Sequence, residues 1–88
     1  MPWTTRLSPE ATKQLEELPP DRLELIGKVI ERMKHDPFRG NVKALQGKQW
    51  KGRFRTAVGR YRLIFIPYHR EQSVEISQIL LRTEKTYH

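Results

Sequence analysis

The chain has no cysteine, which excludes disulfide bonds and thiolate metal sites and is typical of proteins in a reducing compartment. Neither His35 nor His69 has a companion at the spacing of metal ligands, so we predict no metal and no cofactor. No apolar run approaches the roughly 18 residues that span a bilayer, and the first residues do not resemble a signal peptide. We therefore expect a cytoplasmic protein that does not use a membrane.

Acidic residues are missing from the middle of the sequence. No Asp or Glu occurs between Asp36 and Glu71, although this stretch holds nine Lys and Arg residues and accounts for the whole formal net charge of +7. Charge segregated in this way indicates a polyanionic partner. Nucleic acid is the obvious candidate.

The first part of the chain predicts two helices within a single domain of residues 1–88. Ser8 and Pro9 have the residue types of an N-cap and a first helical position, and an apolar stripe follows until Pro19 and Pro20 end the segment. A second amphipathic helix is predicted from about Pro20 or Asp21 to His35. The two helices should form an antiparallel hairpin.

Strands are predicted before and after this hairpin, where the apolar pattern has a period of two. Trp3–Leu7 could form a short first strand, whereas Phe38–Gln49 has the composition of a connector. The segments Trp50–Ala57, Arg60–Tyr68 and Ser73–Leu81 predict an antiparallel meander. The expected fold is α+β: two N-terminal helices packed on a small antiparallel sheet, in the order β-α-α-β-β-β, with a short polar C-terminal tail.

The basic residues Lys51, Arg53 and Arg55 recur at period two, and so do Arg60 and Arg62. On extended strands this spacing directs each set to one sheet face, where Lys and Arg can hold phosphates. The alternative is a solvated edge strand, because Lys and Arg also protect edges against pairing. The absence of interleaved acids favours phosphate binding, which should depend on salt.

Arg62 lies in the otherwise apolar middle strand of the meander, where an arginine costs desolvation energy unless it is paired. It has either a functional role or a structural ion pair with Glu75. Arg82, Tyr87 and His88 follow the last strand and could lie beside the basic face if the tail folds back. Tyrosine and histidine can exchange protons, but a terminal Tyr-His pair is also typical of a disordered end.

Several segments, taken in order, resemble the RelE/ParE superfamily of toxins from bacterial and archaeal toxin–antitoxin systems. The resemblance covers essentially the whole chain. It is carried by Leu45-Gln46-Gly47, Trp50-Lys51-Gly52-Arg53-Phe54-Arg55 and Gly59-Arg60-Tyr61-Arg62-Leu63-Ile64-Phe65, followed by Arg82 and Tyr87.

The resemblance implies a RelE-like fold and one of two activities. RelE-like members cut messenger RNA in the ribosomal A site without a metal, through attack of a ribose 2′-hydroxyl on the neighbouring phosphate. ParE-like members inhibit DNA gyrase instead. In both groups a cognate antitoxin wraps around the toxin, and the complex typically represses its own operon. The implied partners are thus an antitoxin, messenger RNA and the ribosome, with operator DNA reached only through the antitoxin complex.

The resemblance also implies roles for individual residues. Arg62 and Arg82 would hold the scissile phosphate, and Lys51 and Arg53 would position the backbone and assist the leaving oxygen. Tyr87 would act as general base or stacking platform, and His88 as a possible proton donor. The RNA-gripping residues would be Lys48, Arg55 and Arg60. Arg53 departs from the ribonucleases, in which lysine is common, because arginine is a poor proton donor.

We therefore predict an endoribonuclease toxin, an mRNA interferase that inhibits translation. Two alternatives are a ParE-like gyrase inhibitor, which needs none of these residues for chemistry, and a non-catalytic nucleic-acid-binding module. The module would be favoured if the tail were disordered and Arg62 were paired with Glu75.

Overall fold

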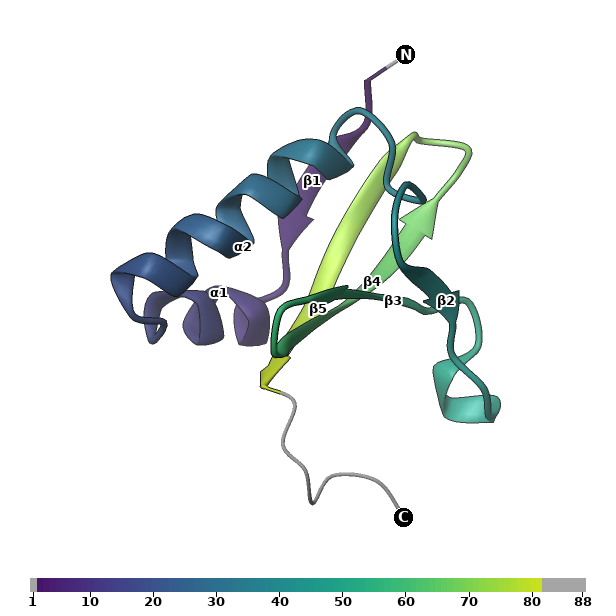
Figure 1. Ribbon diagram of the computed structural model, residues 1–88. Helices are drawn as coiled ribbons and strands as arrows, with labels where there is room; N and C mark the ends of the chain where they lie inside the picture. Colours follow the sequence, from purple (N-terminus) through teal and green to yellow (C-terminus); the bar gives the residue numbers. More distant parts are fainter. Residues whose placement is uncertain (1, 82–88) are drawn as a thin grey trace.

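The structure is a computed structural model that describes residues 2–81, in which two helices cover one face of a five-stranded sheet (Figure 1). The helices are α1 (Pro9–Glu16) and α2 (Pro20–Met33), and a short 3₁₀ helix, η1, spans Lys48–Trp50. The strands are β1 (Thr4–Leu7), β2 (Val42–Ala44), β3 (Phe54–Val58), β4 (Tyr61–Tyr68) and β5 (Ser73–Leu81), arranged in the order β1-β5-β4-β3-β2. The predicted α+β class is confirmed. Within residues 2–81, neither helix has the length and hydrophobicity of a membrane-spanning segment.

The helix boundaries follow the local signals in the sequence. The Ser8 Oγ accepts a hydrogen bond of 3.0 Å from the backbone N–H of Ala11, so Ser8 caps α1 and Pro9 occupies its first position. Helix α2 begins at Pro20 and ends at Met33, two residues before the predicted end. Because Pro37 follows closely and cannot continue a helix, the chain turns away there.

The sheet is mixed, whereas a purely antiparallel sheet was predicted. Strands β2 to β5 form the predicted antiparallel meander, but β1 pairs in parallel with β5 through the register Thr4↔Ser73 to Leu7↔Ile76. A parallel pair needs a long connection, and here the helices and the meander separate the two strands in the sequence. Strand β1 thus closes the edge that β5 would otherwise expose.

The segment before β3 differs from the prediction in two ways. Val42–Ala44, predicted to be part of a connector, forms the edge strand β2, in which Val42 pairs with Thr56 and packs against the core. The predicted strand from Trp50 begins only at Phe54, because η1 and a turn at Gly52 precede it. Gly52 has φ +78°, a conformation that other residues rarely adopt. Lys51 and Arg53 are therefore not strand residues.

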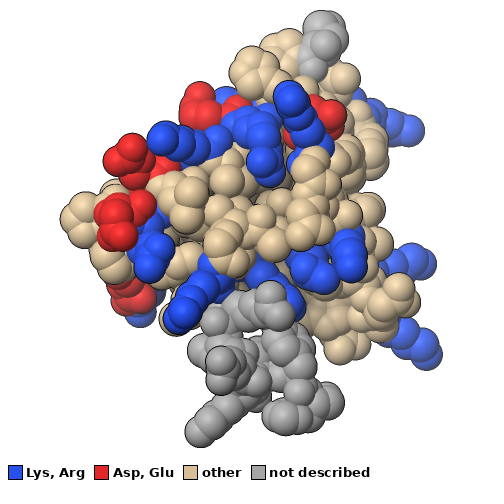
Figure 2. Space-filling view, in the orientation of Figure 1, with Lys and Arg blue, Asp and Glu red and all other residues tan. Residues whose placement is uncertain are grey.

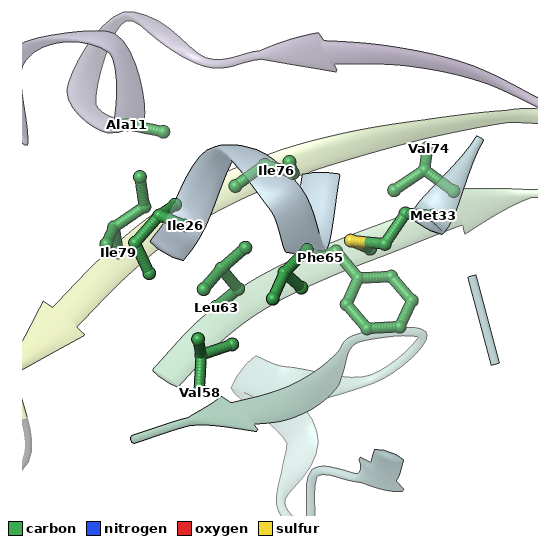
Figure 3. Packing of buried hydrophobic residues seen from close by; sticks show 10 residues of the cluster. Ala11, Ile26, Met33, Val58, Leu63, Phe65, Val74, Ile76 and Ile79 are labelled. Atoms are coloured by element: carbon green, nitrogen blue, oxygen red, sulfur yellow. The ribbon is translucent and has the colours of Figure 1, made fainter. Parts of the chain in front are cut away.

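The hydrophobic core lies between the helices and the sheet (Figure 3). Ile26 and Met33 of α2 point towards Leu63 and Phe65 of β4 and Ile76 of β5, all fully buried. Residues that alternate with these along the strands point to the opposite face of the sheet. That face has no helix over it among the described residues, and we call it the open face.

Candidate nucleic-acid interface

The open face carries basic side chains from three neighbouring elements. Leu63 and Phe65 face the helices, so Arg62 on the same strand faces the other way. Arg55 of β3 pairs across from Ile64 and therefore lies on the open face as well, and so does Lys43 of β2, which pairs with Arg55. The strands of the meander thus direct these cations to one surface.

The sheet register fixes the spacing of these cations. Lys43 lies directly opposite Arg55, and Arg62, paired with Ala57, is the diagonal neighbour of Arg55 at about 7–8 Å between backbones. Like charges directly opposite each other, as Lys43 and Arg55 are, destabilise a sheet. A polyanion laid across the open face would relieve this repulsion, so the arrangement suits phosphate groups.

Arg53 joins this group from the turn that precedes β3. The alternation extended back from Phe54, which packs against the core, puts Arg53 on the open face. Its Nη1 donates a hydrogen bond of 3.2 Å to the Ser77 Oγ of β5. Because β4 lies between β3 and β5, the guanidinium of Arg53 reaches across the central strand. The prediction that Arg53 is borne by a strand was wrong, but the side chain is held on the sheet all the same.

Arg62 is half-buried on the central strand of the sheet. Its suggested ion pair with Glu75 is wrong, because Glu75 pairs across from Ile66. Ile66 is four residues from Arg62, or about 13 Å along an extended strand. Leu80 is the residue opposite Arg62 on β5.

Glu75 belongs to a separate group of side chains towards β1. Its carboxylate accepts a hydrogen bond of 3.4 Å from the hydroxyl of Tyr68, and the guanidinium carbon of Arg6 lies 5.1 Å from the centre of the Tyr68 ring. Arg6 also pairs with Glu75 in the parallel register. The carboxylate of Glu75 is therefore engaged at a distance from Arg62 and Arg55.

The remaining predicted residues divide into two sets. Lys48 lies in η1, Lys51 follows η1, and Arg60 lies in the turn between β3 and β4; all three are exposed and borne by loops. Arg82, Tyr87 and His88 lie outside the described residues. The structure thus brings together Arg53, Arg55 and Arg62, and it does not put Lys48, Lys51 or Arg60 on a strand.

Sequence reasoning missed Lys43 and Ser77. The alternation Val42-Lys43-Ala44 is too short to separate an edge strand from a loop. Ser77 has no sequence signal, because its contact with Arg53 depends on a β-bulge that no residue type announces.

Charge is segregated over the surface as it is in the sequence. Figure 2 shows acidic side chains at the left and along the top of the molecule, with basic ones among them, and only basic ones at the lower right, as far as the described residues are concerned. On α2, a hydrogen bond from the Lys34 side chain and the charge of Lys34 lower the pKa of Glu31. No group of His, Asp and Glu side chains suited to a metal ion occurs among residues 2–81.

Comparisons with known proteins give matches in structure alone: no family model and no curated protein sequence matches the chain. A chain of the RelBE2 toxin–antitoxin complex of Mycobacterium tuberculosis is similar with a TM-score of 0.83 at 26% identity, over 93% of this chain and 100% of that one. A YoeB/ParE toxin of Agrobacterium tumefaciens has a TM-score of 0.76 at 17% identity, over 91% of this chain and 99% of that one. The isolated RelE toxin of E. coli has a TM-score of 0.72 at 16% identity, over 96% of this chain and 88% of that one.

The fold is that of the RelE/ParE superfamily of toxins, which confirms the resemblance seen in the sequence. The similar structures include toxin–antitoxin complexes and toxins of both the RelE and the ParE kind.

Proposed function

We propose that this chain is the toxin of a type II toxin–antitoxin pair and an endoribonuclease that cleaves messenger RNA in the ribosomal A site. The observation that carries the proposal is the group of Arg53, Arg55, Arg62 and Lys43 on the open face, held at sheet spacing with Glu75 engaged elsewhere. Arginines held over a sheet suit phosphate because their forked donors bind its oxygens in pairs.

The proposed reaction forms a bond between a ribose 2′-oxygen and the adjacent phosphorus and breaks the bond to the 5′-oxygen. The products are a 2′,3′-cyclic phosphate and a 5′-hydroxyl. Arg62, fixed on the central strand, would stabilise the extra negative charge that develops on the phosphate, while Arg55 and Lys43 position the backbone on either side.

The two proton transfers need groups other than these cations. Arginine does not release its proton at neutral pH, and Arg53 replaces the lysine common in the ribonucleases. By the family resemblance, Tyr87 would take the proton of the 2′-hydroxyl and His88 would supply one to the leaving 5′-oxygen. Lys48, Lys51, Arg60 and Arg82 would add contacts to the RNA phosphates.

The proposed protein partner is a cognate antitoxin. Support comes from the similar chain in the M. tuberculosis complex and from the group of basic side chains on the open face, which an acidic segment would complement. Binding of such a segment would stabilise the toxin by mass action and cover the site. Operator DNA would be contacted only through this complex.

Primer extension on a message in a translating extract tests the proposal. Wild-type protein should produce discrete cuts within translated codons, and Arg62→Ala and Tyr87→Phe should abolish them. Arg70→Ala is the matched control, since it removes the same charge from an exposed turn between β4 and β5. Intact message in the presence of folded wild-type protein would overturn the ribonuclease proposal.

Gyrase inhibition is the second candidate, favoured by the similarity to the YoeB/ParE toxin of A. tumefaciens. It predicts intact message, growth arrest and DNA damage signalling on expression, with Arg62→Ala still toxic. The third candidate, a non-catalytic nucleic-acid-binding module, would be favoured by an ion pair between Arg62 and Glu75. It loses this support, because the register keeps the two residues apart.

A further inference from the structure

We infer that Ser77 is a positioning residue: its hydroxyl fixes the guanidinium of Arg53 on the open face so that the remaining donors of Arg53 point at a phosphate of bound RNA. The inference rests on the proposed function for its substrate. Its structural basis is the 3.2 Å hydrogen bond from Arg53 Nη1 to Ser77 Oγ.

Ser77 occupies the one irregular position in the pairing of β4 with β5. Ile64 pairs with Gln78 and Phe65 pairs with Ile76, so the register shifts between them and Ser77 is the extra residue of a β-bulge. A bulge bends its strand and redirects a side chain. Here Ile76 is buried in the core, and Ser77 presents its hydroxyl on the open face.

The backbone of the bulge is held in place by the start of α1. The hydroxyl of Ser8 donates a hydrogen bond of 2.7 Å to the carbonyl oxygen of Ser77, and the N–H of Ser8 donates one of 3.0 Å to the carbonyl oxygen of Ile76. The same Ser8 oxygen accepts the capping bond from Ala11. The bulge carbonyl, which regular pairing would leave unsatisfied, is thus bonded, and the backbone of Ser77 is held by the residue that follows β1.

Arg53 needs such a support because its own backbone is not part of a strand. It follows Gly52 in a turn, where its N–H donates to the carbonyl oxygen of Trp50 at 2.9 Å. A free arginine side chain in a turn would lose considerable rotamer entropy on binding. Holding one Nη in advance lowers that loss and favours binding, as preorganisation does in general.

The chemistry of the partner also matters. A carboxylate at position 77 would hold Arg53 more firmly, but it would neutralise the charge that attracts phosphate. A serine hydroxyl is uncharged and accepts one hydrogen bond, so most of the five N–H donors of the guanidinium stay available for an anion. Ser77 therefore orients Arg53 without cancelling its charge.

The test measures binding of a fluorescein-labelled single-stranded 2′-O-methyl RNA, which cannot be cleaved, together with single-turnover cleavage on ribosomes. Ser77→Ala should weaken binding and slow cleavage roughly three- to tenfold, the range expected for one hydrogen bond. Ser77→Thr keeps the hydroxyl and should restore both. Ser73→Ala is the matched control on the same strand, because the hydroxyl of Ser73 is buried without a hydrogen-bond partner; it should match wild type.

A double-mutant cycle separates positioning from a general structural effect. In an Arg53→Ala background the further change Ser77→Ala should have no effect on RNA binding, since the group that Ser77 positions is gone. Equal effects of Ser77→Ala with and without Arg53 would overturn the inference, and so would a Ser77→Ala protein that binds and cleaves like Ser73→Ala.

The outcomes also separate this inference from the proposed function. RNA binding that depends on the Arg53–Ser77 pair without any cleavage by wild type would overturn the ribonuclease and leave the positioning role standing. Cleavage that does not depend on Ser77 would overturn the positioning role and leave the ribonuclease proposal standing. A wild-type protein that neither binds nor cleaves RNA would overturn both.

Discussion

The two faces of the sheet differ in what their side chains contribute, although the same strands supply both. On β4, Leu63 and Phe65 are fully buried beneath the helices, whereas Arg62, between Tyr61 and Leu63 in sequence, lies on the open face. Burial of apolar area stabilises the fold, while like charges on a sheet face oppose it. Stability and the proposed activity are therefore separable by substitution, one face at a time.

The largest effect is expected on the helix-covered face, from Phe65→Ala. Phe65 is fully buried, and its ring stacks on Phe54 and lies against Phe38, with centroids 5.9 and 6.1 Å away. Removing it leaves a cavity and should lower the free energy of unfolding by about 3–5 kcal/mol, measured by urea denaturation. A loss of less than about 1 kcal/mol would mean that the core readily collapses around the site and that the helix-covered face contributes less to stability than its burial indicates.

Arg62→Ala, unlike Phe65→Ala, should cause a large loss of activity and not a loss of stability. Removal of one preorganised donor from a charged transition state typically costs about 10²–10³ in rate, so single-turnover cleavage should fall by that factor. Arg62→Lys keeps the charge but loses the forked geometry, so its cleavage rate should lie between those of wild type and Arg62→Ala. Thermal unfolding of each variant, followed by circular dichroism, is the control. A rate loss that tracks a loss of folded protein would contradict a role in the reaction.

Ser8 caps α1 and also bonds the bulge that carries Ser77, so its removal should affect both stability and RNA binding to a moderate degree. Ser8→Ala loses the cap of α1 and the bond to the Ser77 carbonyl, and the free energy of unfolding should fall by about 1–2 kcal/mol. Thr12→Ala is the control, because the hydroxyl that it removes donates an exposed hydrogen bond to the Ser8 carbonyl. If Ser8→Ala is destabilised but binds the uncleavable RNA like wild type, the bulge holds its shape without the serine.

The main features of the fold could be predicted from sequence because each depends on local signals. Ser8 and Pro9 mark the start of α1, and the change of apolar period marks the meander. The parallel pairing of β1 could not be predicted, since the edge that a first strand joins is decided by the packed helices. β2 was also missed, because three residues give too little periodicity.

The candidate site was predicted in part, for the same reason. Arg55 and Arg62 share a face because both lie on regular strands, where alternation holds. Lys51 does not follow this rule, because η1 and the turn at Gly52 interrupt the extended chain before β3. The contact between Arg53 and Ser77 spans an intervening strand and a bulge, so it is a property of the folded sheet. The catalytic roles of all these residues stay predictions.

Arg55→Ala should have a smaller effect than Ser8→Ala, and it should raise stability instead of lowering it. Lys43 lies opposite Arg55, so removing one charge should raise the free energy of unfolding by roughly 0.2–1 kcal/mol at low salt and less at high salt. The slope of log K for single-stranded RNA against log salt should fall by about 0.7, the value for one phosphate contact. Arg70→Ala, in an exposed turn, should change neither quantity. Equal slopes for wild type and Arg55→Ala would remove Arg55 from the interface.

The smallest effect concerns the acidic, helical side of the molecule. The pKa of Glu31 is lowered from 4.5 by the hydrogen bond and the charge of Lys34, whose Nζ lies 2.7 Å from its carboxylate. A lowered pKa in the folded state means that this pair stabilises the fold above the unfolded pKa and that the contribution is lost as pH falls through the folded value. Both side chains are largely exposed, so the effect should be slight and screened by salt.

The melting temperature of wild type should exceed that of Glu31→Gln near neutral pH, and the difference should vanish at a pH well below 4.5. A difference that persists in acid would mean that Glu31 acts through packing or helix propensity, because by then its carboxylate is protonated and the ion pair with Lys34 is gone.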